Sequence, residues 1–289
     1  MLLLTNSVLR VSVLDPVIDR ERLGPRFCTG GYVYQIEHAR HGPIFSGPEY
    51  PSEHPSVLNG QGIPDVFQFT LFDKPDERPE QKLIVGVGLV GNPSAQMATE
   101  SHFHSPVEEF CTWSTDQSPT QLVMKTTQVY RDWGLQLVRA LLLEVNRLTT
   151  RSELRCTGPA HLPFRWFAHP FFPLNRDRRC CIIPRGYTLL ENEGFTLDRE
   201  SVLRMLPTYD WTKGEYALLG GTLEGDRFEL IQIHPALSAI RVTCDFLPSK
   251  VALWANEKTF SFEPFHESVL QPGESTHWSM TYEFMGEDS

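Results

Sequence analysis

The sequence predicts an all-β protein, built as a large antiparallel sandwich with at most one or two short helices. Its 22 prolines and 20 glycines are spread almost evenly over 289 residues. A helix therefore rarely has the uninterrupted run of about a dozen residues that it needs. Between turn residues, short segments alternate apolar and polar side chains, as strands with one buried face do. No linker or break in composition divides the chain, so we expect one domain over residues 1–289.

The alternating segments succeed one another along the whole chain and account for most of the expected strands. They are VLRVSVL (8–14), GGYVYQIEH (30–38), DVFQFTLF (65–72), TQLVMKTTQVY (120–130), DRFELIQIH (226–234), SAIRVTCDFL (238–247), VALWAN (251–256) and HWSMTYEF (277–284).

Two further segments fit a helix on local pattern. Residues 135–148 (LQLVRALLLEVNRL) contain good helix formers, but Leu141, Leu143 and Val145 alternate with their neighbours. We interpret this segment as a strand that runs into a turn near Thr149–Thr150. In residues 197–207, Asp198 can cap a short helix that Pro207 ends, and we predict that helix.

Composition and charge exclude several classes of partner. The chain is 40% hydrophobic and has 26 basic against 36 acidic side chains, with no basic cluster, so we expect no nucleic-acid partner. It has neither a signal peptide pattern nor an apolar run near the roughly 18 residues of a membrane span, so we expect no membrane partner. The six cysteines lack metal-like spacing. We interpret them as reduced core thiols of a cytoplasmic protein.

Two short motifs resemble cofactor or metal sites. GVGLVG (86–91) matches the letters of a dinucleotide fingerprint, but a proline follows two residues later and no amphipathic helix opens behind it. We therefore expect glycines in a strand or bulge and no nucleotide cofactor. His102 and His104 lie on one face if their segment is a strand, but no third ligand has matching spacing, so no metal is predicted. A pair that contacts sugar or solvent fits them better.

Three arginines follow a turn in NRDRRCC (175–181). Arg176, Arg178 and Arg179 form either a solvated face or, near a pocket, a site for a phosphate or carboxylate.

Two apolar segments each carry one ionisable side chain. His169 lies in PFRWFAHPFFPL (163–174), and Glu263 lies between Phe262 and Pro264 in FSFEPFHESVLQPGES (260–275). A buried imidazole or carboxylate must find partners, and either one alone is more often structural. Together they indicate an acid and a base whose pKa values burial brings toward neutrality, as proton transfer at physiological pH requires.

These two segments resemble, in content and order, motifs of the aldose 1-epimerase or galactose mutarotase-like superfamily. FAHPFF is similar to a mid-chain motif with a catalytic His, and FEPFHESVLQPGE is similar to a run with a catalytic Glu and an L-x-P-G-E turn. Residues 30–49, 61–69 and 82–90 extend the resemblance over most of the chain, and 82–90 is similar to a less studied branch.

The resemblance implies an antiparallel β-supersandwich whose concave face binds a sugar, with no cofactor. His169 would be the general acid toward the ring oxygen and Glu263 the general base toward the anomeric hydroxyl. The early Arg and second His of typical members, in N-R-I and L-H-G-G contexts, are absent. His104, His102 or His54 would have to replace that His, and Asp210 corresponds to an Asp that holds sugar hydroxyls.

Tryptophan side chains add an argument for sugar binding, because sugar rings stack on aromatic faces. Trp254 is the preferred platform, since Ala252 and Trp254 alternate toward the face that we expect Glu263 to share.

The sequence thus favours a carbohydrate mutarotase acting on a small-molecule sugar. A non-catalytic sugar-binding protein and an enzyme for a modified or acidic sugar are the alternatives. If His169 and Glu263 stand a sugar ring apart on one cleft, catalysis is favoured. If they are buried and hydrogen-bonded, a structural role is favoured.

Overall fold

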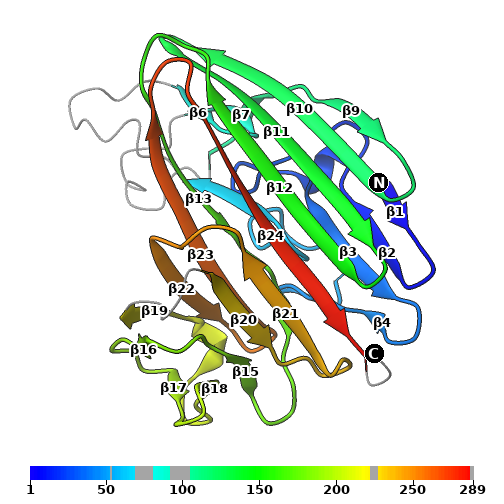
Figure 1. Ribbon diagram of the computed structural model, residues 1–289, viewed down its shortest axis with the longest axis vertical. Helices are drawn as coiled ribbons and strands as arrows, with labels where there is room; N and C mark the ends of the chain where they lie inside the picture. Colours follow the sequence, from blue (N-terminus) through cyan, green and yellow to red (C-terminus); the bar gives the residue numbers. More distant parts are fainter. Residues whose placement is uncertain (53, 69–80, 92–104, 222–226, 287–289) are drawn as a thin grey trace.

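The computed structural model describes residues 1–52, 54–68, 81–91, 105–221 and 227–286, which fold into four β-sheets (Figure 1). All strand pairings within these ranges are antiparallel, which confirms the predicted all-β class. The helical content of the described residues is two short 3-10 turns, η1 (Arg20–Arg22) and η4 (Trp211–Lys213).

The largest sheet has ten strands, and its long members β10, β11, β12 and β24 run side by side in Figure 1. Its spatial order is β17 (Phe195–Leu197), β18 (Val202–Met205), β15 (Arg179–Ile182), β20 (Phe228–Gln232), β21 (Ala239–Cys244), β24 (Ser275–Met285), β12 (Arg147–Cys156), β11 (Trp133–Glu144), β10 (Gln121–Tyr130) and β9 (Ser114–Gln117).

A second sheet of seven strands packs against the first. Its order is β16 (Tyr187–Leu189), β19 (Glu215–Gly221), β22 (Lys250–Ala255), β23 (Thr259–Leu270), β13 (Leu162–Ala168) and β5 (Asp65–Gln68), and β14 (Phe172–Pro173) also pairs with β23. Two smaller sheets complete the fold: β1 (Leu2–Thr5), β2 (Leu9–Val13), β3 (Val33–His38) and β4 (Gly42–Pro43), and β6 (Gln81–Ile84), β7 (Gly88–Gly91) and β8 (Val107–Phe110).

Alternation along the strands of the seven-stranded sheet divides their side chains between two of the three hydrophobic clusters of the described residues. The main core lies between the two large sheets and includes Leu137 and Met280 from one sheet and Leu253 and Phe262 from the other. A second cluster covers the opposite face of the seven-stranded sheet, which we call the outer face; Phe167 is one of its members. Because successive strand residues point to opposite faces, β13, β22 and β23 contribute to both clusters.

The structure corrects two details of the sequence analysis. Residues 135–148 are extended as predicted, but the turn lies between β11 and β12, at residues 145–146, rather than near Thr149–Thr150. The helix predicted in residues 197–207 is wrong. Asp198 Oδ1 instead accepts hydrogen bonds from the backbone N–H groups of Glu200 and Val202, and the turn leads into β18.

The cysteines are free and mostly buried, and the glycine motif lies at a strand irregularity, as expected. All six cysteines are free thiols; five are buried, and Cys111 is partly buried. In GVGLVG, β7 and β8 pair with a register shift between Leu89 and Val90, and Gly88 has a φ of 135°. A side chain at Gly88 would collide with the carbonyl oxygen of Glu109, so a strand irregularity explains this glycine.

A buried ion pair joins the two large sheets. Arg139 projects from β11 into the main core, where its guanidinium donates hydrogen bonds to the Asp65 carboxylate of β5 and to Ser152 of β12. The Arg139 and Asp65 side chains are only 1% and 5% exposed. A charge at this depth is stable only when it is paired and hydrogen-bonded.

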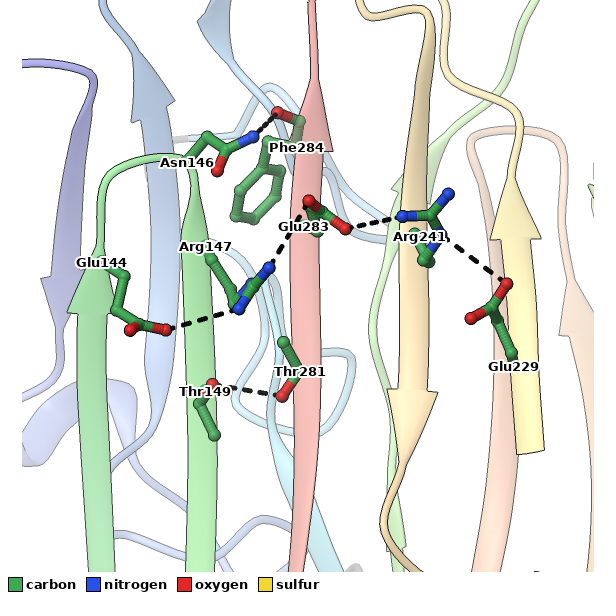
Figure 2. A network of polar contacts seen from close by, with 9 residues as sticks. All are labelled: Glu144, Asn146, Arg147, Thr149, Glu229, Arg241, Thr281, Glu283 and Phe284. Carbon is green, nitrogen blue, oxygen red and sulfur yellow. Dashed lines mark hydrogen bonds and ion pairs between the residues drawn. The ribbon is translucent and has the colours of Figure 1, made fainter. Parts of the chain in front are cut away.

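A contrasting set of ion pairs crosses the solvent-facing side of the ten-stranded sheet. Figure 2 shows the side chains alternating in charge across five neighbouring strands, in the order Glu144, Arg147, Glu283, Arg241 and Glu229. The Arg241 side chain is 42% exposed, so water already solvates much of this network.

We expect Asp65→Asn to lower the free energy of unfolding by about 3–5 kcal/mol, because it leaves the Arg139 charge buried without its counter-ion. Urea denaturation followed by circular dichroism measures this loss. Arg241→Gln, which breaks the exposed network, is the matched control and should cost no more than about 1 kcal/mol. Similar losses in the two variants would contradict the structural importance of the buried pair.

Candidate functional site

The candidate site lies on the outer face of the seven-stranded sheet. Along β23, Phe260 and Phe262 enter the main core, whereas Ser261 and Glu263 project to the outer face. Trp254 lies opposite Ser261 on the neighbouring strand β22, and Trp254 packs against the second hydrophobic cluster. His169 directly follows β13, which pairs with β23 on its other side. The two proposed catalytic groups therefore come from neighbouring strands of one sheet.

His169 and Glu263 are in contact and buried. His169 Nε2 lies 3.3 Å from Glu263 Oε1, and the two side chains are 2% and 5% exposed. The separation is therefore much less than a sugar ring. Two buried side chains in direct contact are the arrangement expected of a structural pair. Catalysis by these two groups requires a sugar to enter between them and replace their contact.

Arg26 is a third charged member of the site. Its Nη2 donates to His169 Nε2 at 3.2 Å. Because a guanidinium has only donors, Nε2 is an acceptor here, and the neutral imidazole carries its proton on Nδ1. Nδ1 lies 3.0 Å from Ser261 Oγ, which can accept that proton in a hydrogen bond. Glu263 Oε1, which also faces Nε2, is then favoured in its protonated form.

Burial shifts the pKa values of these two groups in opposite directions, in each case toward the neutral form. Desolvation raises the pKa of Glu263 to about 7, although Arg26 and Lys250 oppose the change. Desolvation, assisted by the positive charge of Arg26, holds the pKa of His169 well below its usual value of 6.5. Glu263 therefore keeps its proton up to a pH of about 7 while His169 is neutral, so below that pH the facing atoms of the pair hold one proton, a condition under which the pair can donate or accept a proton.

Aromatic rings enclose the imidazole. Phe171 stacks on His169 with ring centroids 4.4 Å apart, and Phe27 meets it edge-on at 6.2 Å. The Trp254 ring lies 5.8 Å from His169, and Tyr216 of β19 is paired with Trp254 and is 50% exposed. Tyr216 and Trp254 thus form an aromatic row that leads from solvent to His169.

The other predicted residues lie elsewhere. Asp210 is exposed and caps η4, where its carboxylate accepts from Thr212, and it lines a different pocket together with Arg178. His54 is exposed, and its backbone N–H donates to Ser52 Oγ rather than to the pair. His102 and His104 lie outside the described residues. Of the predicted sugar contacts that the structure describes, Trp254 is beside His169 and Asp210 is not.

Sequence reasoning did not identify Arg26. The residue lies in RLGPRFC, outside any alternating segment and outside the family's arginine motif. It reaches His169, 143 positions away, because both residues are held beside the same short segment, Pro64–Asp65. The Cys28 N–H, two residues after Arg26, donates to the Asp65 carbonyl, and the His169 N–H donates to the Pro64 carbonyl. The only indication in the sequence is one charged residue between Pro25 and Phe27.

Two further observations concern metal binding and membrane spans. Within the described ranges, no group of three or more His, Cys, Asp or Glu side chains has the arrangement of a metal site. None of the helical segments described is both long and apolar enough to traverse a lipid bilayer.

Several solved structures have the same fold as this chain. A putative aldose 1-epimerase from Escherichia coli K12 is similar over 98% of this chain and 98% of its own, with a TM-score of 0.59 and 14% identity. A galactose mutarotase-like protein from Lactobacillus casei covers 98% and 99%, with a TM-score of 0.58 and 13% identity. The Slr1438 protein from Synechocystis covers 99% and 96%, with a TM-score of 0.58 and 16% identity.

The comparison confirms the fold that the sequence motifs implied. No protein-family model matches the chain, and no curated protein matches it by sequence. The chain therefore has the galactose mutarotase-like fold over nearly its full length.

The raised pKa of Glu263 predicts a specific pH dependence of stability. Between the ordinary carboxyl value of 4.5 and about 7, the folded protein binds a proton at Glu263 that the unfolded chain releases. This contribution to stability therefore falls as the pH rises through that window. Glu263→Gln removes this pH-dependent contribution, so the variant lacks the loss of stability that wild type shows from pH 4.5 to 7. The difference in free energy of unfolding, variant minus wild type, should therefore rise by about a few kcal/mol over this window and then level off.

Urea denaturation at a series of pH values tests this expectation. Glu267→Gln is the matched control, because Glu267 lies on the same strand but is paired with Arg165 at the more exposed end of the outer face. A difference between Glu263→Gln and wild type that stays constant with pH would show that Glu263 titrates normally.

Proposed function

We propose that this protein binds a sugar over the outer face of the seven-stranded sheet and interconverts its α and β anomers. The observation that carries the proposal is the contact between His169 and Glu263, two buried side chains beside an aromatic row, where burial raises the pKa of Glu263 to about 7. The fold shared with putative aldose 1-epimerases supports the same class of substrate. The comparison supports the shared fold, whereas the mutarotase activity is our proposal.

The proposed reaction balances in protons without a cofactor. Without a sugar the shared proton lies on Glu263, so ring opening requires the form in which this proton has moved to His169 Nε2 as the sugar replaces the direct contact. Protonated His169 then gives its proton to the ring oxygen while the Glu263 carboxylate takes one from the anomeric hydroxyl. The bond between the anomeric carbon and the ring oxygen breaks, and the anomeric carbon becomes a carbonyl. Rotation and reclosure reverse both transfers, so each cycle returns the pair to its starting protonation state.

The sugar must replace the direct contact for this cycle to operate. Its anomeric and ring oxygens would lie between Nε2 of His169 and the Glu263 carboxylate. Trp254 and Tyr216 offer aromatic surface on which the face of the sugar can stack. Arg26 donates to the same Nε2 edge and would stabilise negative charge that develops on the sugar oxygens.

We expect His169→Ala and Glu263→Gln each to lower the rate of anomer exchange by on the order of 10²–10⁴, because each removes a positioned proton donor or acceptor. Exchange NMR across a panel of aldoses measures the rate. Arg241→Gln, on the far side of the ten-stranded sheet, is the control and should retain it. Exchange no faster than in buffer, or variants as active as wild type, would exclude catalysis by this pair.

The proposal also predicts how the rate depends on pH. The active pair holds one proton, so activity should fall above the Glu263 pKa of about 7, where that proton is lost. Arg26→Met removes a positive charge that stabilises the Glu263 carboxylate, so the pKa of Glu263 should rise. The fall in activity at alkaline pH, the alkaline limb of the pH profile, should therefore move to higher pH, and the maximal rate should also fall.

Arg165→Met is the control for this shift. Arg165 projects to the same outer face but is not among the charges that lower the pKa of Glu263. An unchanged limb in Arg26→Met, or an equal shift in Arg165→Met, would contradict the role given to Arg26.

A non-catalytic sugar-binding protein is the second candidate. The 3.3 Å contact and the deep burial of the pair favour it, because both are typical of a structural hydrogen-bonded pair. It predicts that sugars change tryptophan fluorescence without accelerating anomer exchange. The third alternative, an acidic sugar held by Arg176, Arg178 and Arg179, gains no support at this site, because Arg178 lines another pocket.

A further inference from the structure

Apart from the candidate site at His169, the described residues form a pocket of about 370 Å³, which we call the second pocket because its lining includes neither His169 nor Glu263. The segment before and within η4 forms one wall, the turn between β22 and β23 contributes Glu257, and the turn before β15 contributes Arg178. The volume falls within the range of sites for small molecules. The pocket unites Asp210 and Arg178, two residues that the sequence analysis selected for separate reasons.

The lining combines aromatic surface with groups that bind hydroxyls. Tyr209 and Trp211 lie 4.9 Å apart, at an angle of 64°, and both line the pocket. Asp210 and Glu257 supply acceptors, and Thr212 supplies a hydroxyl. Asp210 accepts from the Thr212 backbone and hydroxyl and lies 3.8 Å from Lys213 Nζ, but a carboxylate has room for further donors.

Arg178 combines a rare backbone conformation with a buried guanidinium nitrogen that lacks an acceptor among the described residues. Its φ is 55°, in the left-handed region that non-glycine residues rarely adopt. Its Nη1 is buried and has no hydrogen-bond acceptor among the described residues. Both features cost free energy, and a ligand oxygen that accepts from the guanidinium would offset part of that cost.

Trp254 connects this pocket with the candidate site. One side of its ring faces His169. A side chain at Gly214 would lie 3.7 Å from the indole Nε1, so the ring also borders the end of η4. The Gly214 carbonyl in turn accepts a hydrogen bond from the Tyr209 hydroxyl at 2.9 Å. A continuous path of contacts therefore runs from His169 through Trp254 to the second pocket.

From this arrangement we infer that the pocket is a second saccharide subsite. It takes a sugar unit of an oligosaccharide whose reducing end lies over His169 and Glu263, with the chain crossing Trp254. Carboxylates and a guanidinium beside two aromatic rings suit the donors, acceptors and apolar faces of a sugar. The position of the reducing end rests on the proposed function, whereas the binding of sugar at Arg178 and Trp211 does not.

The test compares chain length at two reporter positions. The full-length protein is labelled with 5-fluorotryptophan, and Trp211→Phe and Trp254→Phe assign the two resonances. Glucose, galactose, maltotriose, cellotriose and β-1,4-galactotriose are titrated by ¹⁹F NMR. At least one trisaccharide should shift both resonances and bind at least about 10-fold more tightly than its monosaccharide.

Arg178→Met should remove most of this preference for the trisaccharide, because it deletes the charged donor. Arg204→Met is the matched control, since Arg204 pairs with Asp198 outside the pocket, and it should keep the preference. The inference is overturned if no trisaccharide shifts the Trp211 resonance, or if Arg178→Met and Arg204→Met behave alike.

Failure of the proposed function has a different signature. If the trisaccharide shifts Trp211 but anomer exchange stays at the buffer rate, the subsite stands and catalysis by His169 and Glu263 falls. If monosaccharides exchange rapidly while chain length has no effect on binding, catalysis stands and the subsite is overturned.

Discussion

The geometry of the candidate site depends on the buried ion pair between Arg139 and Asp65. This pair crosses the main core from one large sheet to the other. The backbone beside Asp65 then holds two parts of the site: the Asp65 carbonyl accepts from Cys28 N–H, and the Pro64 carbonyl accepts from His169 N–H, each at 2.8 Å. Because a buried charge must keep its counter-ion, the Pro64–Asp65 segment has little freedom to move. The positions of His169 and of the loop that carries Arg26 follow from it.

The second constraint is the two-residue period of β23. Phe260 and Phe262 fill the main core, so the residues between and after them, Ser261 and Glu263, must point to the outer face. A shift of one residue would bury Glu263 between the sheets and expose the phenylalanines. Packing of the core therefore sets the direction of the carboxylate, while Phe27 and Phe171 shield the neighbouring imidazole from water.

Alternation made the strands predictable from the sequence, and interactions between distant residues limited what else could be predicted. The helix expected after Asp198 failed because an Asp caps tight turns as well as helices, and here its carboxylate closes a turn into β18. His169 and Glu263 were identifiable because each is an ionisable residue in an apolar segment. Arg26 was not, since its place depends on a loop that tertiary hydrogen bonds hold. Asp210 was assigned to the site of His169 from motif order, but it lines the second pocket instead.

The His169–Glu263 pair is held in the protein at a cost in free energy. Burial shifts the pKa of Glu263 upward and that of His169 downward, so each side chain is less easily charged than it would be in water. A carboxyl with a raised pKa reduces folding stability at neutral and higher pH, and apolar residues of similar volume often replace such pairs without loss. Glu263 lies opposite Ala252 and near Phe265, where an apolar side chain would pack without that penalty. Two groups that are held at a cost, one of them with a pKa raised to about 7, fit the acid and base catalysis that we propose.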